Sequence, residues 1–162
     1  MFLSRLFNAL NMSVQEQVVS EILELNEKTK VYGLALKPQD VELMLAARSQ
    51  VLCGYSRVEL GIEVTKELIE LFSASAFIRQ EDYLDTLNEL HEIFYDLKNE
   101  TEDQISDMKL IHKMKEVFEE DCGGSLDFLK SKLEEYAGSF RRELQQNDYL
   151  REGEDDDWYP KM

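Results

Sequence analysis

Six carboxylates recur at steps of three or four residues along one stretch of the chain, a spacing that places them on one side of a helix. This acidic face consists of Asp82, Asp85, Glu89, Glu92, Asp96 and Glu100. Like charges at this spacing each cost about 0.2 to 0.5 kcal/mol, so five neighbouring pairs cost roughly 1 to 2.5 kcal/mol if nothing relieves them. If Lys109, Lys113 or an Arg of another helix balances these charges, the acidic face is simply a solvated surface. If a basic partner balances them, the acidic face is a docking surface.

Arg48 is the second position whose residue type suggests chemistry. It falls four residues after Met44 and four before Leu52, on an otherwise apolar helical stripe. A guanidinium there must either reach water or meet a carboxylate, and we expect pairing with Glu59 or with a carboxylate of the acidic face. The alternative is a polar pocket for a small anionic ligand or a substrate. That pocket would be built from Arg48, Arg57, Glu59 and Lys98, with His91 and Glu100 beside them.

The residue pattern gives little support for a metal site or for a catalytic nucleophile. Neither His91 nor His112 has a Glu three residues before it, as di-iron helical bundles require. Cys53 and Cys122 each precede a glycine at a predicted helix end, where the negative end of the helix dipole raises a thiol pKa. The sequence also contains no glycine-rich phosphate loop and no nucleophile elbow. We therefore predict no catalytic residue, no metal and no cofactor.

The overall composition indicates a single folded domain with a strong negative charge. The 162 residues are 43% hydrophobic and include only seven Gly and two Pro, which favours a helix-rich globular protein. The net charge of -16 disfavours nucleic acid and anionic membrane as partners, and leaves basic proteins and cations open. Two cysteines fit a reducing cytoplasm. No apolar run approaches the roughly 18 residues that a membrane span needs.

Apolar periodicity predicts an all-α, single-domain bundle of about six helices, with short connections that favour antiparallel neighbours. A capping box, Ser13 to Glu16, marks the first helix start, and Pro38, Ser106 and Ser125 mark three others. A second capping box, 101–104, predicts one short turn before Ser106. The predicted helices cover residues 13–28, 38–54, 58–73, 80–99, 106–122 and 125–144.

The two ends of the chain are predicted to lie outside this bundle. Residues 1–12 are interpreted as an N-terminal lead-in, with either Met1 or Met12 as the native start. The helical domain is assigned to residues 13–151. Residues 152–162 form an acidic segment that we expect to be a flexible tail, although its Trp158-Tyr159-Pro160 could serve as a short docking motif.

Three segments are similar to a known family. The segments "RVELG" (57–61), "IFYDLKNETEDQISDMKLIHKMKEVF" (93–118) and "CGGSLDFL" (122–129) resemble an uncharacterised family of small bacterial proteins, a domain of unknown function found mainly in Gram-positive bacteria. The similarity in order and spacing covers roughly residues 34–142. It implies a helical cytoplasmic protein of a Gram-positive bacterium, and it brings no activity, ligand or catalytic residue.

From these observations we expect a non-enzymatic protein–protein interaction module that uses its acidic face. The protein partner is unidentified and possibly basic, and a homodimer is plausible. The competing hypothesis is an enzyme or small-ligand-binding protein that uses the polar pocket around Arg48. An interaction module should leave an apolar patch rimmed by the acidic face, whereas an enzyme should enclose a pocket in which an Arg or His meets carboxylates with shifted pKa values.

Overall fold

The computed structural model describes residues 2–155, apart from the side chains of residues 2, 7–13 and 151–155. Within this range the chain is helical and has no strand, so the prediction of an all-α single-domain bundle is confirmed. The elements are α1 (Phe2–Glu24), α2 (Asn26–Thr29), η1 (Lys30–Tyr32), α3 (Pro38–Gly54), α4 (Glu63–Phe72), η2 (Gln80–Asp82), α5 (Tyr83–Glu100), α6 (Asp107–Glu120) and α7 (Leu126–Asp155). None of these helices combines the length and the apolar composition that a membrane crossing needs.

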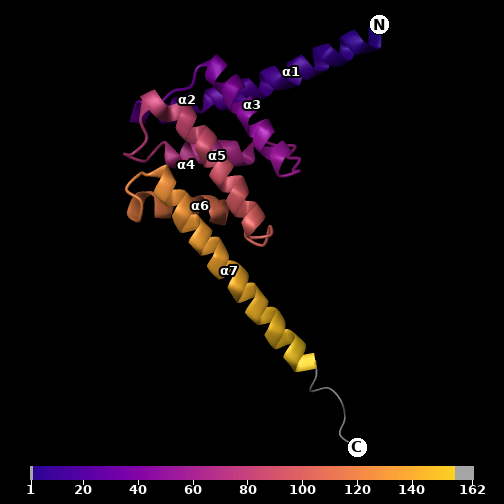
Figure 1. Ribbon diagram of the computed structural model, residues 1–162. Coiled ribbons are helices and arrows are strands. Elements are labelled where there is room, and N and C mark those ends of the chain that lie inside the picture. The colour runs from indigo at the N-terminus through magenta and orange to yellow at the C-terminus, as the bar shows by residue number, and fades with distance from the viewer. Residues whose placement is uncertain (1, 156–162) are drawn as a thin grey trace, which may run out of the picture.

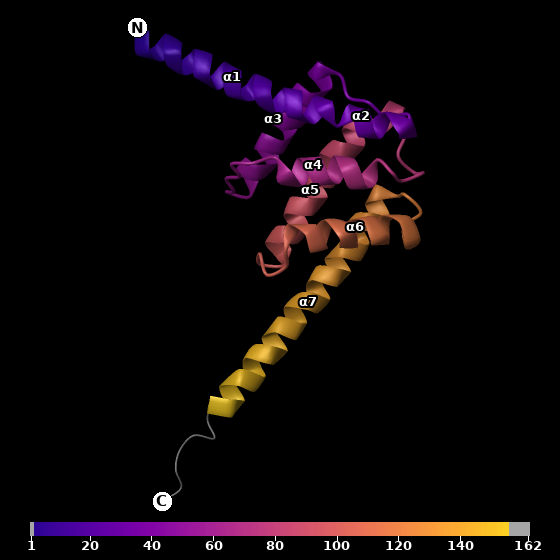
Figure 2. The same cartoon turned by 180° about the vertical axis from the view of Figure 1, so that it is seen from behind.

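The long helix α5 lies at the centre of the bundle and packs against α3, α4, α6 and α7 (Figure 1). In both views α3, α5 and α7 run in one general direction, and α4 and α6 run back across them (Figure 2). The core lies between these two sets of helices, where Leu90 and Phe94 of α5 are fully buried and Phe72 meets Phe118 edge to face at 5.5 Å. Because α4 and α6 cover one side of α5, its other side is left between α3 and α7.

Two helices extend beyond this body, α1 from its upper end and α7 from its lower end (Figure 1). The first half of α1 projects from one end of the bundle, and the second half of α7 projects from the other. Only the second half of α1 packs on α3, through residues such as Ile22. The projecting segments therefore gain no stabilisation from the core, although they keep helical backbone.

Local signals located several helix starts correctly. Pro38 is the first residue of α3, and the carboxylate of Asp40 accepts a hydrogen bond from the Lys37 backbone N–H at 2.9 Å. Ser106 caps α6, since its hydroxyl accepts from the Lys109 N–H. Ser125 directly precedes α7. These are local interactions, which the sequence specifies without the rest of the fold.

Three predicted boundaries are wrong. The helix expected to start at Ser13 begins at Phe2, because residues 2–12 contain neither Gly nor Pro and the helix continues back through the capping-box pattern. The helix expected from residue 58 begins at Glu63. Helix α7 continues to Asp155, four residues into the segment 152–162 that was expected to be a tail, and residues 156–162, including the Trp158-Tyr159-Pro160 motif, lie outside the described residues.

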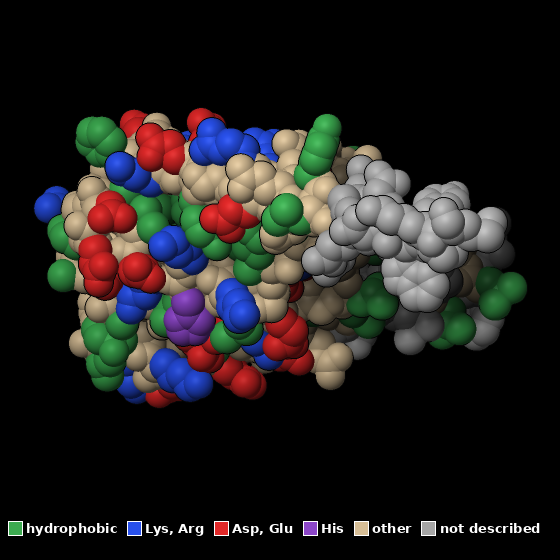
Figure 3. All heavy atoms as spheres, turned by 90° about the horizontal axis from the view of Figure 1, so that it is seen from below, with side chains coloured by type: hydrophobic (Ala, Val, Ile, Leu, Met, Phe, Trp, Pro, Cys, Tyr) green, Lys and Arg blue, Asp and Glu red, His purple; other side chains and the backbone are tan. Residues whose placement is uncertain are grey.

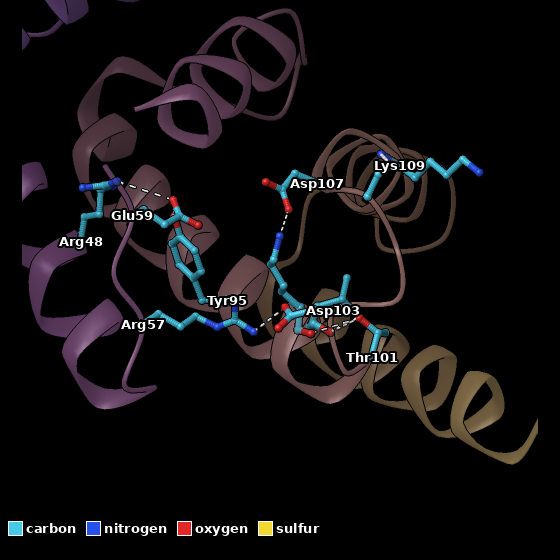
Figure 4. Close-up of polar contacts among 11 residues, drawn as sticks. Arg48, Arg57, Glu59, Tyr95, Thr101, Asp103, Asp107 and Lys109 are labelled. Carbon is cyan, nitrogen blue, oxygen red and sulfur yellow. Dashed lines mark hydrogen bonds and ion pairs between the residues drawn. The ribbon is translucent and has the colours of Figure 1, made fainter. Parts of the chain in front are cut away.

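The second capping box is also wrong, and the difference matters for the site. Thr101 ends α5 instead of starting a turn, and its hydroxyl donates to the Leu97 carbonyl at 2.9 Å. Glu102 and Asp103 then take left-handed backbone conformations, with φ of 55° and 58°. This reversal directs the Asp103 carboxylate toward α3 and the loop that follows it (Figure 4).

Candidate functional site

Arg48 of α3 and Glu59 of the loop after α3 form the centre of a buried polar cluster (Figure 4). Their charged groups lie 3.6 Å apart, and the Arg48 guanidinium also donates to the Gly61 carbonyl at 2.7 Å. The hydroxyl of Tyr95, a fully buried residue of α5, donates to the Glu59 carboxylate at 2.6 Å. The expected pairing of Arg48 with Glu59 is thus present. Burial, reinforced by the neighbouring Glu59 carboxylate, raises the pKa of Tyr95, so this hydroxyl remains a hydrogen-bond donor at neutral pH.

His91 lies close to this cluster and is equally buried. Its Nδ1 is 2.6 Å from the Leu87 carbonyl, which can only accept, so Nδ1 carries the proton. Its Nε2 then accepts from the Thr65 hydroxyl at 2.8 Å. Burial lowers the pKa of His91 to about 4, and the positive charge of Arg48 adds to that effect. The imidazole is therefore neutral at physiological pH, with both nitrogens engaged.

The remaining members of the predicted polar pocket are directed elsewhere. Arg57 pairs with Asp103 at 2.6 Å, and Lys98 pairs with Asp107 and lies over the Phe94 ring at 5.9 Å. Asp103 lies between α5 and α6, and Asp107 is the first residue of α6 (Figure 4). The structure therefore brings Arg48 and Glu59 together, whereas Arg57 and Lys98 pair with two other carboxylates.

These contacts hold the loop between α3 and α4 from several sides. Glu59 and the Gly61 carbonyl bind Arg48, and Arg57 binds the turn after α5. The same loop leaves two aliphatic side chains in water, Val58 at 87% and Leu60 at 102% of full exposure. The polar cluster is thus an anchor for this loop, because each of its charged groups is neutralised by another group of the chain.

The acidic face is divided between two neighbourhoods. Asp82, in η2, and Asp85 and Glu89, on α5, border a shallow hollow of about 420 Å³ beside Arg79 and residues 124–127. The other three members, Glu92, Asp96 and Glu100, line a different surface next to α7. Neither Lys109 nor Lys113 forms an ion pair with the acidic face among the described residues. Lys113 pairs with Glu116 instead, and the described ion pairs do not include Lys109. An Arg of another helix serves instead, since Arg141 of α7 pairs with Glu100.

The surface beside α7 is a groove of about 460 Å³, which we call the acidic groove. Its floor consists of apolar side chains of α5 and α7, namely Ile93, Leu97, Leu133 and Ala137. Its rim consists of Tyr55, Glu92, Asp96, Glu100, Lys130, Glu134 and Arg141. A smaller hollow toward α3, of about 380 Å³, shares Tyr55 and Glu92 with it. The exposed side of α5 is therefore recessed between α3 and α7.

Charge within the groove is only partly balanced. Four carboxylates and two basic side chains line it, and among the ion pairs of the described residues none involves Glu92, Asp96 or Glu134. The Tyr55 hydroxyl donates to Asp96 at 3.0 Å. Burial, that hydrogen bond and the nearby charges of Asp96, Glu92 and Glu100 raise the pKa of Tyr55 to about 12. Burial is the largest of these causes, and the three carboxylates add to it.

Another face of the molecule carries charges of both signs. Figure 3 views the molecule from below relative to Figure 1, and there acidic and basic side chains alternate over the surface. Charges of mixed sign at short range largely cancel, whereas like charges in a recess reinforce each other. The spacing on α5 identified three of the seven rim residues. It missed Glu134 and Tyr55, because nothing in the spacing of α7 or α3 indicates that they face α5.

Comparison with known proteins finds one match. The model of DUF6323, described as a family of unknown function, matches residues 21–146. No significant match to a curated protein or to a solved structure is found. The matched range contains every residue of the acidic groove and of the polar cluster. The projecting first half of α1 lies outside it.

Proposed function

Because the chain belongs to DUF6323, a family of unknown function, we propose its function from the site itself: it is a non-enzymatic interaction protein. Its acidic groove receives a positively charged, amphipathic segment of a protein partner. The observation that carries this proposal is a groove rimmed by four carboxylates, of which Glu92 and Glu134 take part in none of the ion pairs of the described residues. A recess with surplus negative charge supports binding of a basic segment.

The electrostatics favour an occupied groove over an empty one. Glu92, Asp96 and Glu100 follow one another at four-residue spacing on α5, and each such like-charge pair costs about 0.2 to 0.5 kcal/mol in an isolated helix. Arg141 relieves one end of this series. A Lys or Arg brought by a partner would relieve the repulsion among the others.

The competing enzyme or ligand-binding hypothesis has weaker support. Arg48, Arg57 and Lys98 are each paired with a carboxylate of the chain, so a ligand would have to break an ion pair to bind. His91 is neutral, with both of its nitrogens hydrogen-bonded. The polar cluster holds the loop between α3 and α4 in place and leaves no free charged group for a ligand among the residues named here. We therefore assign binding to the acidic groove.

A peptide-binding experiment tests the proposal. The probe is a synthetic amphipathic helix of about 14 residues made of Lys and Leu, with a Glu/Leu helix as the negative control. We expect the Lys/Leu peptide to bind, and binding to weaken roughly 5- to 30-fold when Glu92→Gln and Glu134→Gln are combined, because two exposed charge pairs contribute about 1 to 2 kcal/mol in total. Binding is measured by fluorescence anisotropy at low ionic strength, since salt screens surface charges.

The matched control removes two carboxylates elsewhere on the surface. Glu116→Gln with Glu120→Gln changes the net charge by the same amount on α6, where both side chains are exposed. If both double variants weakened binding equally, the peptide would be responding to net charge and not to the groove. That result, or equal binding of the Glu/Leu peptide, would refute the proposal.

A further inference from the structure

We propose that the acidic groove of one molecule binds the projecting first half of α1 from a second copy of the chain, so that the protein associates with itself tip to groove. This inference rests on the proposed function, because it uses the same groove. It names one occupant, of which the structure describes the helical backbone from Phe2 onward and the side chains of residues 3–6 and 14.

Three apolar side chains of α1 are exposed beyond the point where the helix leaves the body. Val14, Leu6 and Leu3 are 60%, 48% and 78% exposed, respectively, and at 3.6 residues per turn they lie within about 80° of one another around the helix. Ile22, which is fully buried against the core, is turned by about 80° to 160° from them. Exposed apolar side chains that share one side of a helix present a surface suited to a groove.

The charge of this segment also complements the groove. Residues 1–15 contain Arg5 and no Asp or Glu, although the whole chain has 34 acidic residues against 18 basic ones. Arg5 is exposed between Leu3 and Leu6. A segment with a single positive charge and an apolar stripe therefore lies on a chain whose groove has unpaired carboxylates over an apolar floor.

The arrangement of the helices directs this contact to another molecule. The projecting half of α1 leaves the bundle beside α3, at the other end of the bundle from the projecting half of α7 (Figure 2), whereas α5 and α7 supply most residues of the groove. About thirteen residues at 1.5 Å each give a rigid rod of roughly 20 Å, which cannot fold back without breaking the helix. The nearest groove that it can enter is that of a neighbour.

A lipid surface is the other partner that an exposed amphipathic helix suggests. Stable binding of such a helix to anionic lipid needs several Lys or Arg residues on its polar face, and this segment has only Arg5. The net charge of -16 would also repel an anionic surface. A protein groove is therefore the better match.

Analytical ultracentrifugation of the full chain at low ionic strength gives the first test. We expect the wild type to sediment as a concentration-dependent assembly of two or more chains. Leu3→Ser with Leu6→Ser, and separately Glu92→Lys with Glu134→Lys, should each return the protein to the mass of one chain. All four positions are exposed, so both variants should keep the fold, which the far-UV circular dichroism spectrum checks.

A mixing experiment distinguishes tip-to-groove contact from the other ways of self-association. The variant with Leu3→Ser and Leu6→Ser keeps its groove, and the variant with Glu92→Lys and Glu134→Lys keeps its tip. We expect an equimolar mixture to form a complex of two chains, although each variant alone has the mass of one. A control with Glu116→Lys and Glu120→Lys on α6 should associate like the wild type.

Three outcomes would overturn the inference. They are a wild type with the mass of one chain up to about 1 mM, a tip variant that still assembles, and a mixture that does not assemble. Binding of the wild type, but not of the tip variant, to vesicles of phosphatidylglycerol and phosphatidylcholine, together with a monomeric wild type, would assign the tip to lipid instead. Binding of the Lys/Leu peptide by the variant with Leu3→Ser and Leu6→Ser would show that the proposed function stands even where self-association fails.

Discussion

The buried imidazole of His91 should make the folding stability depend on pH in a defined window. Its folded-state pKa of about 4 lies below the ordinary value of 6.5, so the unfolded chain binds this proton more readily than the folded one. The neutral imidazole therefore makes its full contribution to the free energy of unfolding above pH 6.5, and this contribution is lost as the pH falls toward 4. At about 1.4 kcal/mol per pKa unit, the loss is about 2 kcal/mol between pH 7 and pH 5, and about 3 kcal/mol by pH 4.

Urea unfolding of the wild type and of His91→Gln across pH 7 to pH 4 measures this contribution. Many carboxylates titrate in the same window, but they are common to both proteins. The difference between the two free energies of unfolding therefore isolates the imidazole, and we expect that difference to shrink by about 2 kcal/mol from pH 7 to pH 5. His112→Gln is the matched control, because His112 is exposed. A difference that stayed constant with pH would refute the assignment of His91 as a buried neutral group.

Two further predictions concern the anchor loop and the turn before α7. Glu59→Gln should lower the free energy of unfolding by about 2 to 3 kcal/mol in urea titrations, because it leaves the Arg48 guanidinium buried without a counter-charge; an unchanged value would show that the pair is not structural. Gly124→Ala should destabilise by about 2 kcal/mol or more, because φ is +85° and an added Cβ would lie 2.5 Å from Cβ of Phe77. Gly138 lies in the interior of α7, where an added Cβ would have no atom within 4 Å. Gly138→Ala should therefore stabilise the helix by about 1 kcal/mol and raise the thermal midpoint. Equal effects of the two substitutions would contradict both assignments.

Short-range information in the sequence was enough for the fold class and for most helix starts. The starts at Pro38, Ser106 and Ser125 depend on residues within three or four positions, and periodic apolar residues identified the buried sides of α5 and α6. The pairing of Arg48 was also accessible, because a guanidinium on a buried stripe needs a carboxylate and Glu59 is close in the chain.

The loop between α3 and α4 shows why other features were not accessible. The third helix was expected from residue 58, yet residues 57–62 are not helical and α4 begins at Glu63. The conformation of this loop is held by contacts with α3, α5 and the turn after α5, and those partners are between about 10 and 50 residues away in sequence. Tertiary contacts of this kind override local propensity.

The sequence by itself therefore determined that the chain is a helical domain, where most of its helices begin, and that one side of α5 is acidic. Only the tertiary structure decided that α7 lies beside α5, which turns half of that acidic side into a groove with Glu134 and Arg141 on its opposite rim. It also decided that the first half of α1 projects from the body (Figure 1), where Leu3, Leu6 and Val14 are exposed. The physical reason is that spacing along one helix specifies which side chains share a face, whereas the packing of distant helices specifies what that face meets.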